Sequence, residues 1–126
     1  MLVVALPTLA WACSCLSPGQ WVGQLDQVPA LFAGEVTEAW DDARAARIAV
    51  LERWRGAIGS SVLVTAVSMG SCTGTRFRTG QRVIIRAGHP AADGRYQVHE
   101  CSITTYPVSD PRLRDALRRL APRAGG

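Results

Sequence analysis

Residues 30–54, ALFAGEVTEAWDDARAARIAVLERW, decide the fold, because they contain two strand-like runs joined by a short polar turn at Asp41-Asp42. Strands are expected over 30–40 and 45–54. One face of the second strand would carry Ile48, Val50, Glu52 and Trp54. Gly34, inside the first run, predicts a bulge or a sharp bend. The stretch therefore predicts a strongly coiled antiparallel pair of the kind that a small barrel needs.

Three more short runs of strand type follow along the chain. Residues 62–67 and 82–87 are apolar and rich in β-branched side chains, and residues 95–99 follow a turn signal at Asp93-Gly94. Five strands with glycine-punctuated turns are typical of a closed or nearly closed barrel of the oligonucleotide/oligosaccharide-binding (OB) type. An immunoglobulin-like sandwich needs about seven strands and fits less well.

A helix is expected on each side of the strands. Before them, Trp21, Leu25 and Val28 fall at helical spacing and Pro29 stops the run. After them, Asp110 is a good N-cap and the helix would end at Pro122. Its apolar stripe would consist of Leu113, Ala116, Leu117 and Leu120. The predicted class is thus mainly β, a five-stranded barrel with a short N-terminal helix and a C-terminal α-helix.

The first twelve residues are uncharged and almost wholly apolar, and they end in Ala10-Trp11-Ala12, a small-x-small pattern. Signal peptidase cuts after such a pattern, so we expect a signal peptide over 1–12 and one mature domain over 13–126. The run is too short to span a bilayer, which takes roughly 20 residues. The alternatives are a buried N-terminal element, or a lipoprotein signal that would use Cys13 as its anchor. The expected location is secreted or periplasmic.

Four cysteines, Cys13, Cys15, Cys72 and Cys101, predict two disulfides in a short exported chain. A Cys13–Cys15 bridge would close a strained ring. The two other pairings both tie the N-terminal pair to distant segments and stay open on spacing alone. Each bridge closes a loop of roughly 60 to 90 residues, worth on the order of 4 kcal/mol. A structural zinc site fits less well, because the chain has no Cys-x-x-Cys pair, and no cofactor is expected.

The charge pattern and the candidate nucleophiles argue against nucleic-acid binding and against catalysis. The net charge of +4 comes from arginine alone, and five arginines lie in the C-terminal segment, where they alternate with acids and leucines. This pattern favours a solvated helix face over a nucleic-acid surface. Ser60 and Ser102 lack nucleophile signatures. His99 and Glu100, as strand neighbours, would point to opposite faces. We expect a monomer that is not an enzyme and does not bind nucleic acid.

Several stretches together resemble the tissue inhibitors of metalloproteinases and their bacterial relatives. The string Cys13-Ser14-Cys15-Leu16-Ser17-Pro18 resembles the mature N-terminus of these inhibitors. Residues 30–36 are similar to the first barrel strand of the bacterial relatives, and 50–56 to the end of their second strand. Cys72 with 83–87, and Cys101-Ser102-Ile103-Thr104, match the segments around the later cysteines. The resemblance covers nearly the whole mature chain.

The resemblance implies a netrin-like barrel with the pairings Cys13–Cys72 and Cys15–Cys101. It also implies an inhibitory wedge, made of Cys13, Ser14, Cys15, Leu16, Gly70 and Ser71. The α-amine and carbonyl oxygen of Cys13 would chelate the catalytic zinc of a target metalloprotease, and Ser14 would enter its specificity pocket. The alternative function is an exported binding or structural module in which Cys-x-Cys is only a staple.

Overall fold

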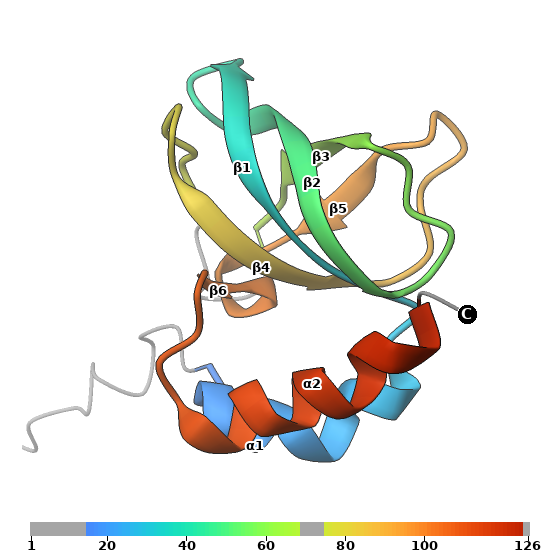
Figure 1. Cartoon of the computed structure of the whole chain (residues 1–126). Helices are drawn as coiled ribbons and strands as arrows, with labels where there is room; N and C mark the ends of the chain where they lie inside the picture. Colours follow the sequence, from blue (N-terminus) through green and yellow to red (C-terminus); the bar gives the residue numbers. More distant parts are fainter. Residues whose placement is uncertain (1–14, 69–74, 125–126) are drawn as a thin grey trace, which may run out of the picture.

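The computed structural model describes residues 15–68 and 75–124, which form a mainly β structure. One sheet curls into a half-barrel with the strand order β5-β3-β2-β1-β4-β6 (Figure 1). Every neighbouring pair is antiparallel except β3 and β5, which are parallel. The strands are β1 (Ala30–Trp40), β2 (Ala45–Arg55), β3 (Ser61–Ala66), β4 (Arg82–Ala87), β5 (Tyr96–Val98) and β6 (Ile103–Thr105).

The expected strand number of five is wrong, because the sheet of the described residues has six strands. The additional strand is β6, which pairs with β4 through Ile103 opposite Ile85 and Thr105 opposite Val83. Three residues span too short a stretch to display a period of two, so the sequence offers no alternation there. The other five strands fall where the apolar runs predict them, within two residues at each end.

The helices lie together beneath one end of the curled sheet (Figure 1). On the N-terminal side, one α-helical turn, α1 (Pro18–Trp21), continues as a 3₁₀ helix, η2 (Val22–Gln27). On the C-terminal side, α2 (Pro111–Ala124) runs past Pro122, where its end was expected. Proline removes a single i→i−4 hydrogen bond, and this close to the end of the helix the loss affects only the last turn. A further 3₁₀ turn, η3 (Glu100–Ser102), joins β5 to β6.

The sheet separates two hydrophobic cores, because β1 and β4 are buried on both faces. The inner core fills the curl and contains Phe32, Val36, Ile48, Val64, Val83, Ile85 and Val98, among others. The outer core lies between the sheet and the helices. It contains Trp21, Leu25, Val28, Leu31, Ala33, Ile84, Leu113, Ala116 and Leu117. The predicted apolar stripes of both helices therefore meet on the outer face of the sheet.

Bulges shift the pairing of β1 with β2, as Gly34 led us to expect. Register shifts occur at Ala33/Gly34 and at two other places. A Cβ atom on Gly34 would lie 2.5 Å from the backbone oxygen of Ala49, so only glycine lets the two strands approach this closely. The shifts also correct one expectation. Ile48 and Val50 pack in the inner core, whereas Trp54 packs against the outer one.

No helix in the described parts of the chain has the length and apolar character that a membrane crossing requires.

Candidate functional site

The predicted wedge is described only in part. Cys13, Ser14, Gly70 and Ser71 lie outside the described residues, as does Cys72, the expected partner of Cys13. The leader expected over 1–12 lies outside them as well. Cys15 and Leu16 are described, and both are exposed to solvent. We refer to these two residues as the N-terminal edge.

A disulfide attaches the N-terminal edge to the sheet. Cys15 is bonded to Cys101, with their Cα atoms 4.9 Å apart. Cys101 belongs to η3, between β5 and β6, so the bond joins the start of the described chain to the connection between the two edge strands. This is the partner that the family resemblance implies for Cys15, one of the two that spacing alone left open.

Local hydrogen bonds fix both ends of this disulfide. Just after Cys15, the backbone N–H of Ser17 donates to Oε1 of Gln20 at 2.8 Å, which closes the first turn of α1. At the other end, the backbone N–H of Cys101 donates to Nδ1 of His99 at 3.2 Å, and the N–H of His99 donates to Oγ of Ser102. His99 therefore caps η3 and follows β5, instead of lying in a strand that reaches residue 99.

Arg86, on β4, connects the N-terminal helices to the disulfide. Its Nη1 donates to Oε1 of Gln24 at 2.9 Å, and its Nη2 donates to the backbone oxygen of Cys101 at 3.0 Å. The guanidinium also lies over the ring of Trp21, 4.7 Å from the centroid. Burial lowers the pKa of Arg86, which still remains a permanent cation at neutral pH. We call Arg86, Trp21, Gln24 and Cys101 the arginine clamp.

The arginine clamp was not predicted from the sequence. Helical spacing places Trp21 in the N-terminal helix, and Arg86 falls within the apolar run 82–87, so neither pattern indicates a contact between them. One signal was available: Arg86 follows Ile84 by two residues, so both lie on the outer face of β4, where Ile84 is fully buried. A charged residue at a position that alternation assigns to a core needs a buried partner.

Leu16 presents an apolar side chain at the surface of the N-terminal edge. Leu16 is 36% exposed and stands next to the anchored Cys15, so its side chain is accessible to another molecule. In the residues that the structure describes, no three His, Cys, Asp or Glu side chains gather in a way that could hold a metal ion. Asp41 and Asp42 are exposed in the β1–β2 turn, as expected.

No protein-family model matches the chain, and no curated protein matches it significantly.

Proposed function

We propose that the mature chain is a secreted, netrin-like protein of the OB class that inhibits a zinc metalloprotease with its N-terminal edge. Export would remove residues 1–12 and leave Cys13 as the first residue, with a free α-amine. A second disulfide, Cys13–Cys72, would complete the attachment of the edge, with Gly70 and Ser71 beside it.

The anchoring of the N-terminal edge carries this proposal. The disulfide from Cys15 and the arginine clamp hold the chain two residues after the proposed first residue of the mature protein. An inhibitor that is fixed in its bound conformation loses little conformational entropy on binding. A staple of this kind at the leading end is what a wedge requires.

The proposed chemistry needs only the backbone of Cys13. A neutral α-amine nitrogen and the adjacent carbonyl oxygen form a five-membered chelate ring with zinc in the target. They would occupy the coordination position that a catalytic zinc keeps open for its water. Because that water is the source of the nucleophile, its displacement stops hydrolysis. Ser14 would then enter the specificity pocket of the protease, and the exposed Leu16 would contact its surface.

The second candidate is an exported binding or structural module with no effect on proteases. It is favoured by the arginine clamp, because the clamp joins β4, η2 and η3 and stabilises the fold whether or not Cys13 has a free amine. In this case the Cys-x-Cys pair serves only as a staple.

Inhibition by a protein with a defined N-terminus distinguishes the two functions. The chain is exported with its leader, its first residue is established by mass spectrometry, and the inhibition constant is measured against a panel of zinc metalloproteases. A control form carries one additional alanine before Cys13, which converts the amine into an amide. The proposal expects this control to bind about 100-fold more weakly, or roughly 2.7 kcal/mol.

Failure of the folded, cleaved protein to inhibit any member of the panel favours the binding module. Equal inhibition by the two forms contradicts the zinc chelate. A mature protein that begins before Cys13 also contradicts it.

A further inference from the structure

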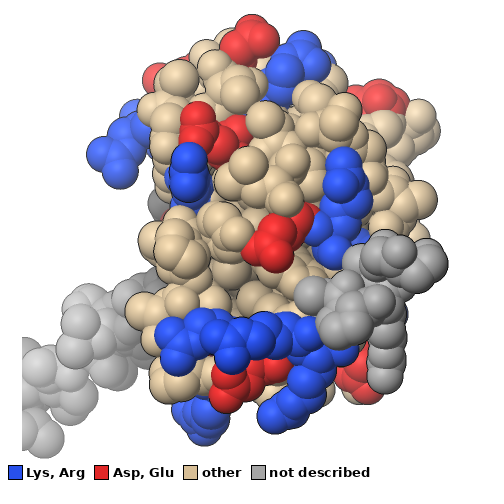
Figure 2. Space-filling model, viewed as in Figure 1, with Lys and Arg blue, Asp and Glu red and all other residues tan. Residues whose placement is uncertain are grey.

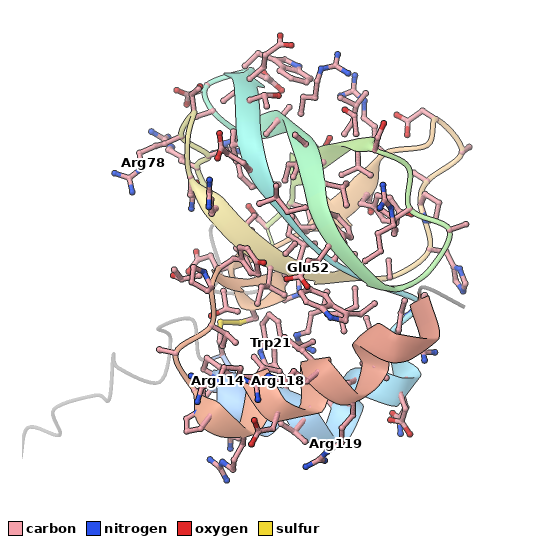
Figure 3. All side chains as sticks on the ribbon, in the orientation of Figure 1. Trp21, Glu52, Arg78, Arg114, Arg118 and Arg119 are labelled. Atoms are coloured by element: carbon pink, nitrogen blue, oxygen red, sulfur yellow. A yellow bond between two sulfur atoms is a disulfide. The ribbon has the colours of Figure 1, made fainter. Side chains whose placement is uncertain are left out.

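A groove opens on the outer face of the sheet, beside α2, and Cys15 and Leu16 of the N-terminal edge do not line it. Its volume is about 260 Å³, and its walls come from β2, β4, the β6–α2 connection and α2. In Figure 3, Glu52 lies on the sheet side, whereas Arg114 and Arg118 lie on the helix side. We call this hollow the α2 groove. It shares no residue with the arginine clamp.

The floor of the α2 groove is apolar. Ile84 and Leu117 belong to the outer core and are 0% and 4% exposed. Trp54 packs against the same core but is only partly buried, so part of its indole faces the groove. An apolar or aromatic group that covered Trp54 would remove apolar surface from water, and it would gain ring contacts in addition.

The charged side chains on the two sides of the groove differ in the partners they have. On the sheet side, the Glu52 carboxylate accepts a hydrogen bond from the Tyr106 hydroxyl. On the helix side, Arg118 pairs with Asp115 at 3.6 Å. Arg114 makes no ion pair with any described residue, although it lines the groove. Of the two arginines that line the groove, Arg114 is therefore the one without an ion pair to a described residue, and it is available to a ligand.

Arg114 belongs to a wider cationic surface. Figure 2 shows basic side chains gathered in a band along the lower part of the molecule, over α2. The arginines that α2 contributes to the groove, Arg114 and Arg118, are one helical turn apart, so they lie on the same face. A guanidinium can bind a carboxylate through two parallel N–H donors, so a carboxylate is a ligand group that matches Arg114.

We propose that the α2 groove binds a small amphiphilic carboxylate with one aromatic or branched aliphatic group. The apolar group covers Trp54 and Leu117, and the carboxylate pairs with Arg114, with Arg118 beside it. The volume of about 260 Å³ lies just below the range of about 300–1,000 Å³ that is typical of ligand pockets, and it therefore suits a single ring or short chain. The inference does not depend on the proposed inhibition of a protease.

Calorimetric titration of the full chain with 3-phenylpropionate tests the site. Three comparison ligands separate the contributions of its parts: acetate lacks the apolar group, 3-phenylpropionamide lacks the charge, and phenethylamine reverses it. The expected result is binding of 3-phenylpropionate at millimolar concentration or below, with each comparison ligand at least about 10-fold weaker. Equal affinity for the acid and the amide overturns the carboxylate assignment, and tighter binding of the amine does the same.

Variants of α2 then locate the site. Arg114→Gln removes the free cation from an exposed helix position, so the fold is expected to survive. The matched control is Arg119→Gln, which removes the same charge from the same helix outside the groove, on the side facing η2 (Figure 3). The expected loss of affinity is about 10-fold for Arg114→Gln and less than about 2-fold for Arg119→Gln. Equal losses, or no binding of 3-phenylpropionate by the unmodified chain up to about 10 mM, overturn the proposal.

Discussion

Arg86 is the residue at which three separate parts of the chain meet. Its side chain extends from β4, and its guanidinium contacts the N-terminal helices and the disulfide turn. Hydrogen bonds from a charged donor are stronger than neutral ones, and Trp21 adds a cation–π contact. Arg86 is thus a structural residue that positions the N-terminal edge.

Replacement of Arg86 by methionine tests this role. Arg86→Met keeps much of the apolar stem but loses both hydrogen bonds and the contact with Trp21, and we expect it to lower the free energy of unfolding by about 2–4 kcal/mol. Arg82→Met on the same strand is the control, since it removes only an exposed ion pair with Glu35. That change is expected to cost at most about 1 kcal/mol. Urea unfolding of both variants measures the difference, and equal losses would contradict the clamp.

Gly34 permits the closest approach between β1 and β2. In Gly34→Ala, the new methyl group meets the Ala49 carbonyl and the Ile48 side chain, and the backbone oxygen cannot rotate away. We expect Gly34→Ala to lower the free energy of unfolding by about 1–3 kcal/mol. This loss outweighs the small gain that alanine brings by reducing the entropy of the unfolded chain. Gly23→Ala is the control, because nothing lies within 4 Å of its new Cβ. Thermal unfolding that shows Gly34→Ala to be neutral would disprove the close contact.

Tyr106 makes the stability sensitive to alkaline pH. Its hydrogen bond to Glu52 raises the pKa of the Tyr106 hydroxyl, and burial and the negative charge of Glu52 act in the same direction. The folded state therefore holds this proton more tightly than the unfolded state, whose tyrosine pKa is about 10. The resulting stabilisation is complete below pH 10 and is lost as the pH rises through the raised pKa of the folded state.

Tyr106→Phe is expected to remove this contribution. The unmodified chain should lose more stability than Tyr106→Phe between about pH 8 and about pH 11, because only the former has a proton to release at this position. The urea midpoints of both proteins at the two pH values give the comparison. If both proteins lost the same stability between the two pH values, the Tyr106 hydroxyl would not form its hydrogen bond to Glu52 in solution.

At the scale of the element, α2 depends on its first turn. Oδ1 of Asp110 accepts from the backbone N–H groups of Arg112 and Leu113, at 2.9 and 3.2 Å. Asp110→Ala leaves these donors without their cap, and we expect it to lower the free energy of unfolding by about 1 kcal/mol. Asp110→Asn should keep most of the stability, because its side-chain oxygen can accept the same hydrogen bonds. Ser109→Ala, one residue earlier, is the control. Urea unfolding followed by circular dichroism measures the effect, and a neutral Asp110→Ala would contradict the cap.

Elements with a long, uninterrupted pattern could be predicted from the sequence. The first four strands are runs of at least six residues of strand type, and the stripe of α2 follows a helical period, so their positions follow from local signals. The missed features lack such a signal. β6 has three residues, and the bulges of β2 reverse the alternation between Val50 and Trp54. A bulge depends on the partner strand, which a local pattern does not contain.

Less of the candidate site than of the fold could be predicted from the sequence. Cysteine content predicted disulfides, and the family resemblance implied a bond between Cys15 and Cys101, which the structure contains. The arginine clamp and the pairing of Tyr106 with Glu52 were missed, because they join residues far apart in sequence. Such contacts follow from how the sheet curls and where the helices cover it, and neither is fixed by spacing along the chain.

At the scale of the whole molecule, the disulfide connects the beginning of the described chain to the turn between the two edge strands, β5 and β6. Cys15 and Cys101 are 86 residues apart in sequence, so their bond strongly restricts the unfolded chain. Cys15→Ser with Cys101→Ser is expected to lower the free energy of unfolding by about 4–5 kcal/mol on the chain-entropy model. Leu16→Ser changes an exposed neighbour without breaking the bond, and it should have little effect. Guanidinium unfolding provides the measurement, and a loss of less than about 1 kcal/mol would contradict this account.

The outer core brings the first helices of the described chain against the last one. During synthesis, Trp21 and Leu25 leave the ribosome about ninety residues before Leu113 and Leu117, which cover them. The strands between them can pair in the meantime, but apolar side chains on the outer face of the sheet remain exposed to water until α2 has emerged. A chain that terminates early, before α2, is therefore expected to expose Trp21 and Ile84 together and to become a substrate for chaperones.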